Sequence, residues 1–320
     1  MSEVVLEARG LKVYYRTKRG PVRAVDGVDF DLHLGETLGV VGETGCGKST
    51  LGKAILGLLP PGTQTEGSLT FRGQDLLHLK PSEFRTFRGK RIALIFQDPM
   101  TRLDPLMTIR DHFVETIRAH EREATKEEAT ERAAEALRAM GIPRSRLNHY
   151  PHEFSGGMRQ RIMIAMAVVL RPALLIADEP TTALDVIVEA QILDILRDLK
   201  EAYGMSLLLI THNLGVVAEV CDRTSVMYAG RFAELGPVQD VFRRPIHPYT
   251  QGLLASTIHL QTKELRSIDG QPPSLLSPPP GCRFHPRCEY AKEICEVEEP
   301  AMIEYRPGHF ASCHFGRDFL

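Results

Sequence analysis

The sequence predicts an α/β fold in which a parallel sheet is covered by helices on both faces. Short, continuous apolar runs alternate along the chain with helical stretches, and this alternation is typical of buried parallel strands joined by helical crossovers. A glycine-rich loop also joins one apolar run to a helix, and its residue pattern is that of phosphate-binding loops. Both observations favour the same α/β class, the phosphate-loop fold.

The expected strands are short apolar runs without helical spacing. They lie at 37–41, 92–96, 174–177, 207–210 and 225–228. Runs of this length, rich in Val, Ile and Leu, fit the interior of a parallel sheet. From residue 4 to about residue 96, short β-rich runs alternate with glycine-containing turns, so an antiparallel β subdomain is expected there as well.

Helices are expected at about 48–58, 125–140, 186–203 and 214–221, and the whole stretch from about 98 to 170 has a helical composition. Residues Thr125 to Met140 are rich in Ala, Glu and Arg, and their apolar side chains fall on one stripe. Gly141-Ile-Pro143 is a typical stop signal after such a helix.

Composition excludes several classes of protein. Lys and Arg number 39 against 41 Asp and Glu, so no strongly basic field indicates a nucleic-acid partner. The longest apolar run, 162–170, has nine residues, whereas a membrane-spanning helix needs about 20. The first residues, MSEVVLEARG, lack the pattern of a secretory signal. Any role at a membrane is therefore expected to depend on partner proteins.

Residues 42–49 carry the strongest functional signal. Gly42-Glu-Thr-Gly-Cys-Gly-Lys-Ser49 matches G-x-x-x-x-G-K-[ST] between an expected strand and an expected helix. Glycines let successive N–H groups turn towards a phosphate chain, and the helix N-terminus adds positive charge. Lys48 is expected to neutralise the β/γ-phosphates, and Ser49 to bind Mg²⁺. The expected nucleotide contacts are Gly42, Glu43, Thr44, Gly45, Cys46, Gly47, Lys48, Ser49 and Thr50.

Two acidic residues end the apolar run at 174–177. Asp178 and Glu179 are expected at the carboxyl edge of the sheet, where ligands of such folds bind. Asp178 is suited to hold Mg²⁺ through water, and Glu179 to act as general base on the attacking water. The sequence thus predicts a nucleoside triphosphatase.

Phe154-Ser155-Gly156-Gly157-Met158, followed by Arg159-Gln-Arg161, resembles the signature sequence of ABC transporter ATPase subunits. Ser155 is expected to cap a helix opened by the two glycines. The resemblance implies a RecA-like phosphate-loop NTPase core, and it implies that Ser155, Gly156 and Gly157 face the γ-phosphate of ATP held by a second ATPase subunit. Met158 stands where Gln is more usual.

Other marks of that family follow in order. By resemblance, Gln97 contacts Mg²⁺ or the attacking water. Asp185 ends the Thr182-Ala-Leu-Asp185 loop that crosses to the other subunit. His212 is the switch histidine that bonds the γ-phosphate, and it is followed by Asn213 where many relatives have Asp. Tyr15 is expected to stack on adenine, with Tyr14 as the competing aromatic.

The resemblance divides the chain into four parts. Residues 1–97 are the first part of the ATP-binding core with its antiparallel β subdomain, 98–170 the helical signature subdomain, 171–250 the second part of the core, and 251–320 a small Cys-rich C-terminal extension. A proline-rich connector at 271–280 lies within the extension, and it is excluded from helix and sheet interiors.

Two segments resemble the dipeptide/oligopeptide importer branch of the family. These are Phe96 to Ile109, which would meet the permease, and the region from His247-Pro-Tyr-Thr-Gln-Gly-Leu-Leu254 through the tail. The resemblance implies an ATP-hydrolysing subunit on the cytoplasmic face of the inner membrane, with two permease subunits and, indirectly, an extracytoplasmic solute-binding protein. The second ATPase is expected to be a paralogue, although a homodimer stays open. Import of nickel or another small solute, and a non-transport ABC ATPase, also remain alternatives.

Four cysteines, Cys282, Cys288, Cys295 and Cys313, crowd the C-terminal extension. Their spacing fits neither paired zinc hooks nor the common ferredoxin pattern. Four thiolates can nevertheless surround a [4Fe–4S] cluster, which relatives with similar tails are implicated in binding. Zinc and purely structural cysteines stay open. The extension has too few apolar residues for a core of its own, so a cluster would act as a structural staple.

Overall fold

The computed structural model describes residues 3–96, 102–181, 185–256 and 268–320. The chain forms two compact units. One unit comprises Met1–His78 and Leu209–Leu320, and the other comprises Leu79–Leu208. Among the described residues, none of the helices combines the length and the apolar character that crossing a bilayer requires.

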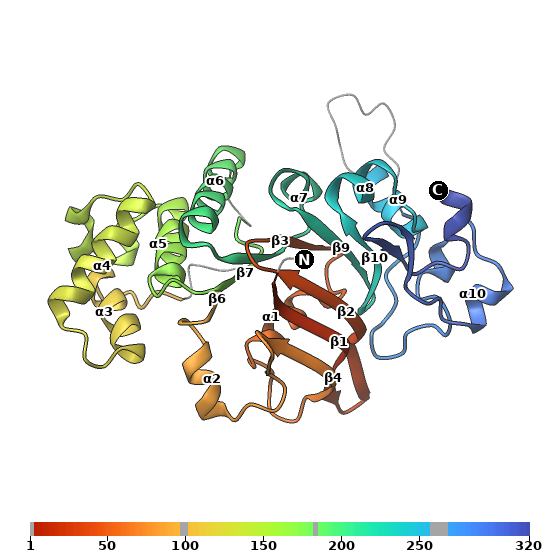
Figure 1. Ribbon diagram of the computed structural model, residues 1–320, viewed down its shortest axis with the longest axis horizontal. Coiled ribbons are helices and arrows are strands. Elements are labelled where there is room, and N and C mark those ends of the chain that lie inside the picture. The colour runs from red at the N-terminus through yellow and green to blue at the C-terminus, as the bar shows by residue number, and fades with distance from the viewer. Residues whose placement is uncertain (1–2, 97–101, 182–184, 257–267) are drawn as a thin grey trace. The chain divides into compact units, whose positions relative to one another are not determined.

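An antiparallel sheet forms the N-terminal part of the first unit, and its strands β1, β2 and β4 lie side by side in Figure 1. Its strand order is β2-β1-β4-β5, with bounds Val4–Thr17 (β1), Gly20–His33 (β2), Gln64–Phe71 (β4) and Gln74–Asp75 (β5). The expected antiparallel β region is confirmed, but β1 and β2 are long strands, where short runs were predicted. Shifts of register, such as that between Ala8 and Leu11, let a long strand continue through residues that interrupt its alternation.

A second set of strands in this unit has the order β11-β12-β10-β9-β3. Its bounds are Thr37–Val41 (β3), Arg223–Tyr228 (β9), Arg231–Pro237 (β10), Ile303–Arg306 (β11) and His309–Ala311 (β12). The predicted parallel pairing is confirmed for β3 with β9. No strand was predicted beyond β9, where a turn at Ala229 and Gly230, both at positive φ, folds β10 back antiparallel. Such two-residue turns produce hairpins.

The helices of this unit are α1 (Lys48–Ile55), α7 (Leu214–Val220), α8 (Val238–Arg243), α9 (Pro248–Ala255) and α10 (Glu293–Val297), with short 3₁₀ turns η3 (His285–Arg287) and η4 (Gly316–Phe319). Helix α1 was expected to reach Leu58 and ends earlier. Gly57 takes φ 59°, and the Leu58 N–H bonds back to the Lys53 carbonyl at 2.8 Å. A left-handed glycine with this bond is a common helix stop.

The second unit holds the parallel strands β6 (Ile92–Ile95) and β7 (Leu174–Asp178), and the chain leaves it along β8 (Ser206–Ile210). Its helices are α2 (Pro81–Phe87), α3 (Ile109–His120), α4 (Lys126–Ala139), α5 (Gly156–Val168) and α6 (Val186–Tyr203), with 3₁₀ turns η1 (Arg144–Asn148) and η2 (Pro151–Glu153). The predicted helix at 125–140 is confirmed as α4. Thr125 caps it in a capping box with Glu128, and Ala129, Ala133 and Leu137 are buried.

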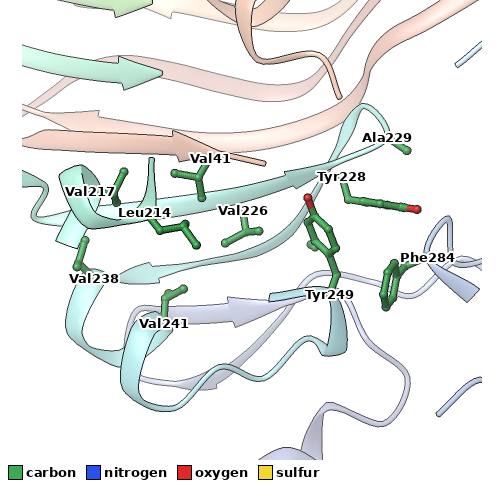
Figure 2. Packing of buried hydrophobic residues seen from close by; sticks show 11 residues of the cluster. Val41, Leu214, Val217, Val226, Tyr228, Ala229, Val238, Val241, Tyr249 and Phe284 are labelled. Carbon is green, nitrogen blue, oxygen red and sulfur yellow. The ribbon is translucent and has the colours of Figure 1, made fainter. Parts of the chain in front are cut away.

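The C-terminal extension packs on the core of the first unit. Figure 2 shows Phe284 of the extension beside Tyr228 of β9 and Tyr249 of α9. The ring centroids of Phe284 lie 5.2 Å from Tyr228 and 5.4 Å from Tyr249. Burying an aromatic side chain contributes about 1.5–3 kcal/mol, and β12 also pairs with β10. The extension therefore packs against the core of the first unit. This packing was not predicted from the sequence.

Candidate functional site

The phosphate loop joins β3 to α1 in the first unit, and two of its positions admit only glycine. Gly42 has φ 151° and Gly47 has φ 117°. A Cβ atom would lie 2.1 Å from the Met227 carbonyl oxygen at Gly42, and 2.0 Å from the Ala24 carbonyl oxygen at Gly47. These distances are far below a van der Waals contact. The close approach of the neighbouring backbone thus fixes the curl of the loop.

Lys48 and the start of α1 supply positive charge at this loop. The Lys48 side chain is buried, and its Nζ donates to the carbonyl oxygens of Gly42 at 2.7 Å and Glu43 at 3.2 Å. Ser49 and Thr50 lie in the first turn of α1, which carries no acidic residue. Thr44 and Gly45 are exposed at the tip of the loop. This arrangement suits an anion that lies over the loop.

Tyr14 and Tyr15, the competing aromatics on β1, have different partners. Tyr15 Oη lies 3.1 Å from the Thr50 hydroxyl, so its ring stands beside the start of α1. Tyr14 donates to Asp26 instead, and burial together with that hydrogen bond raises the pKa of Tyr14 to about 12. Tyr15 is thus the tyrosine next to the loop.

His212 follows β8 in the same unit and is exposed. The neighbouring Asn213 caps α7, because its Oδ1 accepts from the N–H groups of Gly215 at 3.0 Å and Val216 at 3.4 Å. An aspartate would cap the helix through the same oxygen. The departure from the usual Asp therefore leaves the loop after His212 structurally intact.

Asp178 ends β7 in the second unit and Glu179 follows it directly, and both are half-buried. Glu179 has φ 49°, a left-handed conformation that costs a residue with a Cβ atom about 1–2 kcal/mol. Strained residues of this kind gather at functional sites, where the surrounding structure holds them in place. Among the residues that the structure describes, Arg72, Arg171 and Ala229 share this conformation. The strain at Glu179 therefore points to a site only together with the place of Glu179 directly after β7.

The Ser155–Gly157 segment opens α5, as predicted. The Ser155 side chain accepts from the Met158 N–H at 3.4 Å. A Cβ atom at Gly157 would lie 2.7 Å from Val188 Cγ1, so the glycine lets α5 approach the start of α6. Asp185 caps α6 by accepting from the Val188 N–H at 2.9 Å.

Gln160 was not singled out from the sequence. Its side chain is buried, and Nε2 donates to the Pro180 carbonyl oxygen at 2.5 Å. This bond ties α5 to the turn directly after Glu179. The sequence carried no signal for this bond, because no spacing rule links Gln160 to Pro180 and the burial of the glutamine is known only from the structure.

The predicted site residues are divided between the two units. The first holds the phosphate loop, Tyr15 and His212, and the second holds Asp178, Glu179, Ser155, Gly156, Gly157 and Asp185. Gln97 and the loop residues Thr182, Ala183 and Leu184 lie outside the described residues.

Cys46 lies inside the loop with 5% of its surface exposed, and burial raises the pKa of its thiol. Because the thiolate is the reactive form, we expect a maleimide to label Cys46 more slowly than the partly exposed Cys221. A label on Cys46 would fill the loop, so the labelled fraction should no longer bind ATP. Mass spectrometry of labelled sites, followed by ATP titration, checks both expectations, and labelled Cys46 with unchanged ATP affinity would contradict the second.

The four cysteines of the extension line one small cavity of about 20 Å³, together with aromatic side chains. All four are free thiols. Burial, with a smaller contribution from neighbouring cysteines, raises the pKa of Cys282 and of Cys313 to about 11. Within the described ranges, no group of three or more His, Cys, Asp or Glu side chains is arranged to hold a metal ion.

Comparison with protein-family models gives two matches. The model described as ABC transporter matches residues 25–182, and the model described as oligopeptide/dipeptide transporter, C-terminal region, matches residues 233–295. Among solved structures, the dimeric ATP-binding cassette MJ0796 bound to ADP and Pi is 26% identical, with a TM-score of 0.65, over 73% of this chain and 98% of that one. The structure of cbiO1 from Clostridium perfringens has a TM-score of 0.66 at 26% identity over 77% and 93%.

Relatives of known name match along almost the whole chain. The dipeptide transport ATP-binding protein DppD of Bacillus subtilis is 48% identical over 97% of this chain and 94% of its own length. The oligopeptide transport ATP-binding protein OppD of Salmonella typhimurium is 48% identical over 98% and 94%. By these matches, the chain belongs to the family of ATP-binding proteins of dipeptide and oligopeptide ABC transporters.

Proposed function

We propose that this ABC-type ATPase couples ATP binding and hydrolysis to the uptake of dipeptides or oligopeptides through two permease subunits. The observation that carries the proposal is the match of residues 233–295 to the C-terminal region of oligopeptide/dipeptide transporters. That region distinguishes this branch from ABC ATPases in general, and relatives named for peptide transport match the chain at 48% identity.

The phosphate loop fits a magnesium-bound triphosphate, because the close approach of neighbouring backbone at Gly42 and Gly47 fixes its curl, and a curled glycine-rich loop presents N–H groups to phosphate. Lys48 neutralises the β/γ-phosphates and Tyr15 stacks on adenine. Ser49, Asp178 and Gln97 would hold Mg²⁺, which neutralises charge on the phosphates when bound. Glu179 accepts the proton of the attacking water, and His212 donates to the γ-phosphate.

Each ATP site is completed by a second ATPase subunit. Ser155, Gly156 and Gly157 supply N–H groups at the start of α5, and such groups bind the γ-phosphate held by the partner. Asp185 belongs to the loop that reaches the partner. A paralogue is the proposed partner, with a homodimer as the alternative, and the dimeric state of the solved cassette MJ0796 supports pairing.

The proposed location is the cytoplasmic face of the inner membrane, with the chain held there by two permeases. An extracytoplasmic binding protein would deliver the peptide. Charge balance supports the absence of a nucleic-acid partner.

The test is capture of the tagged chain from the membranes of its source cell, followed by reconstitution of the recovered complex in liposomes. We expect two permeases and a second ATPase to co-purify, and ATP to drive accumulation of labelled dipeptide above that of labelled nickel. The Lys48→Ala complex is the control for ATP dependence. Nickel uptake without peptide uptake, or recovery with ribosomes in place of membranes, would contradict the proposal.

We further propose that Cys282, Cys288, Cys295 and Cys313 hold a [4Fe–4S] cluster. Their convergence on one cavity supports this, and four thiolates suit iron–sulfur or zinc. The cavity of about 20 Å³ has room for about one water, so the thiols would have to move outward around a cluster. Anaerobic purification with iron, sulfide and zinc analysis and an absorption spectrum tests the assignment. Stoichiometric zinc, or neither metal, would contradict it.

A further inference from the structure

The segment between Cys282 and Cys288 contacts the phosphate loop directly. Arg287 forms a two-pronged ion pair with Glu43, the second residue of the loop. The distances are 2.8 Å from Nη1 to Oε2 and 3.0 Å from Nη2 to Oε1. The Arg287 side chain is 5% exposed and that of Glu43 is 24% exposed. Bidentate pairs shielded from water are stronger and more directional than ordinary surface pairs.

Further hydrogen bonds, to groups outside the phosphate loop, fix the orientation of the Arg287 guanidinium. Its Nε donates to the Asp269 carbonyl oxygen at 2.8 Å, and Nη2 donates to that of Ile268 at 3.3 Å. Nη1 also lies 3.3 Å from the Tyr228 hydroxyl. A guanidinium fixed on several sides loses little freedom when it binds a carboxylate. Arg287 is therefore preorganised to hold Glu43.

The C-terminal half of the unit reaches the loop at two more points. The buried Tyr249 hydroxyl accepts from the Glu43 N–H at 3.0 Å. Arg283 donates to the Ala229 carbonyl oxygen, and the adjoining Gly230 N–H donates to the Cys46 carbonyl oxygen at 2.7 Å. The loop is thus bound at Glu43 by Arg287 of the extension and by Tyr249 of α9. At Cys46 it is bound by the turn at Ala229 and Gly230, which Arg283 stabilises.

We propose that Arg287 is a positioning residue for ATP binding, which holds the phosphate loop in its binding conformation through Glu43. The proposal rests on the ATPase function given above. The cysteine-bearing extension then forms part of the nucleotide site. A displacement of Cys288, which is next to Arg287 in the chain, would change the position of the phosphate loop through the Arg287–Glu43 ion pair.

The test is a double-mutant cycle with Arg287→Gln and Glu43→Gln in the full chain, read out as the Kd of a fluorescent ATP analogue. Either substitution removes the same Arg287–Glu43 ion pair from the loop. Each single variant should therefore raise the Kd about tenfold, and the double variant should raise it no further than either single variant does. In the reconstituted transporter, KM for ATP should rise by the same factor while kcat of Arg287→Gln changes by less than about twofold.

Two further variants serve as controls. Glu299→Gln removes another ion pair of the extension, with Arg231, at residues for which no contact with the phosphate loop is seen in the described structure, and it should leave the Kd unchanged. Arg287→Lys keeps the positive charge but cannot donate two parallel hydrogen bonds to the carboxylate. It should therefore bind ATP more tightly than Arg287→Gln but less tightly than the wild type. If Arg287→Gln does not fold, the Kd of Glu43→Gln alone tests the proposal, because this substitution leaves the extension unchanged.

Wild-type affinity in Glu43→Gln, or single effects that multiply in the double variant, would overturn the proposal. The wild-type chain measured in parallel separates this failure from failure of the ATPase function. If the wild type binds and hydrolyses ATP while the variants match it, only the role of Arg287 is lost.

Discussion

Replacing Lys48 by alanine is expected to weaken ATP binding by at least about 100-fold, and to abolish hydrolysis at millimolar ATP. The Lys48 ammonium is buried and held 2.7 Å from the Gly42 carbonyl oxygen, so it lies within the curl of the loop. No other lysine of the described part of α1 is buried. Its loss would leave the phosphate charge uncompensated in a site partly shielded from water.

Isothermal titration with ATP measures this effect directly. Lys53→Ala is the matched control, because Lys53 lies in the last turn of the same helix and is exposed. The control should bind ATP as the wild type does. Equal affinities of wild type and Lys48→Ala would remove Lys48 from the nucleotide site.

Replacing Glu179 by glutamine is expected to lower turnover by about 100-fold or more, while ATP binding is retained. The amide keeps the shape of the side chain but cannot accept the proton of the attacking water. Because ATP then stays uncleaved, the closed dimer should accumulate. Glutamine carries a Cβ atom as glutamate does, so it meets the same steric cost at this left-handed position, φ 49°, and we expect the local conformation to be kept.

Phosphate release and size-exclusion chromatography with ATP measure these two outcomes. The exposed Glu201 of α6 offers the control Glu201→Gln, which should hydrolyse ATP at the wild-type rate. Undiminished hydrolysis in Glu179→Gln would show that another group is the base.

The parts of the fold that local sequence encodes were predictable. The start of α4 needs only Thr125 and Glu128, three residues apart, and a capping box is readable at that distance. The strand at Thr37–Val41 is buried throughout, and an uninterrupted apolar run indicates this directly. The N-cap role of Ser155 depends on its own neighbours in the same way.

The contacts that the sequence did not reveal join residues far apart in the chain. Arg287 and Glu43 are separated by 244 positions, and Tyr249 and Glu43 by 206. Neither periodicity nor a spacing rule links such residues, since their meeting depends on how β9, β10 and α9 pack. The antiparallel run of β10 and β12 was missed for a related reason, because an Ala229-Gly230 turn is a weaker hairpin signal than Asn-Gly.

The cysteine tail shows how composition can mislead. Four cysteines and few apolar residues predicted a segment that a metal cluster would staple, with purely structural cysteines as an open alternative. In the structure, Phe284 and the pairing of β12 with β10 attach the extension to a core that the rest of the chain supplies. Composition counts the apolar residues of a segment, but it does not show which neighbouring core can receive them.

Dilution of the purified chain, with the hydrolysis rate per molecule as readout, tests most directly whether two chains build each ATP site. We expect the rate to fall as the protein is diluted, to recover when the partner ATPase is added, and to be lost in Ser155→Arg, which blocks the helix start offered to the partner. A rate per molecule that stays constant at every dilution and survives Ser155→Arg would contradict the shared site.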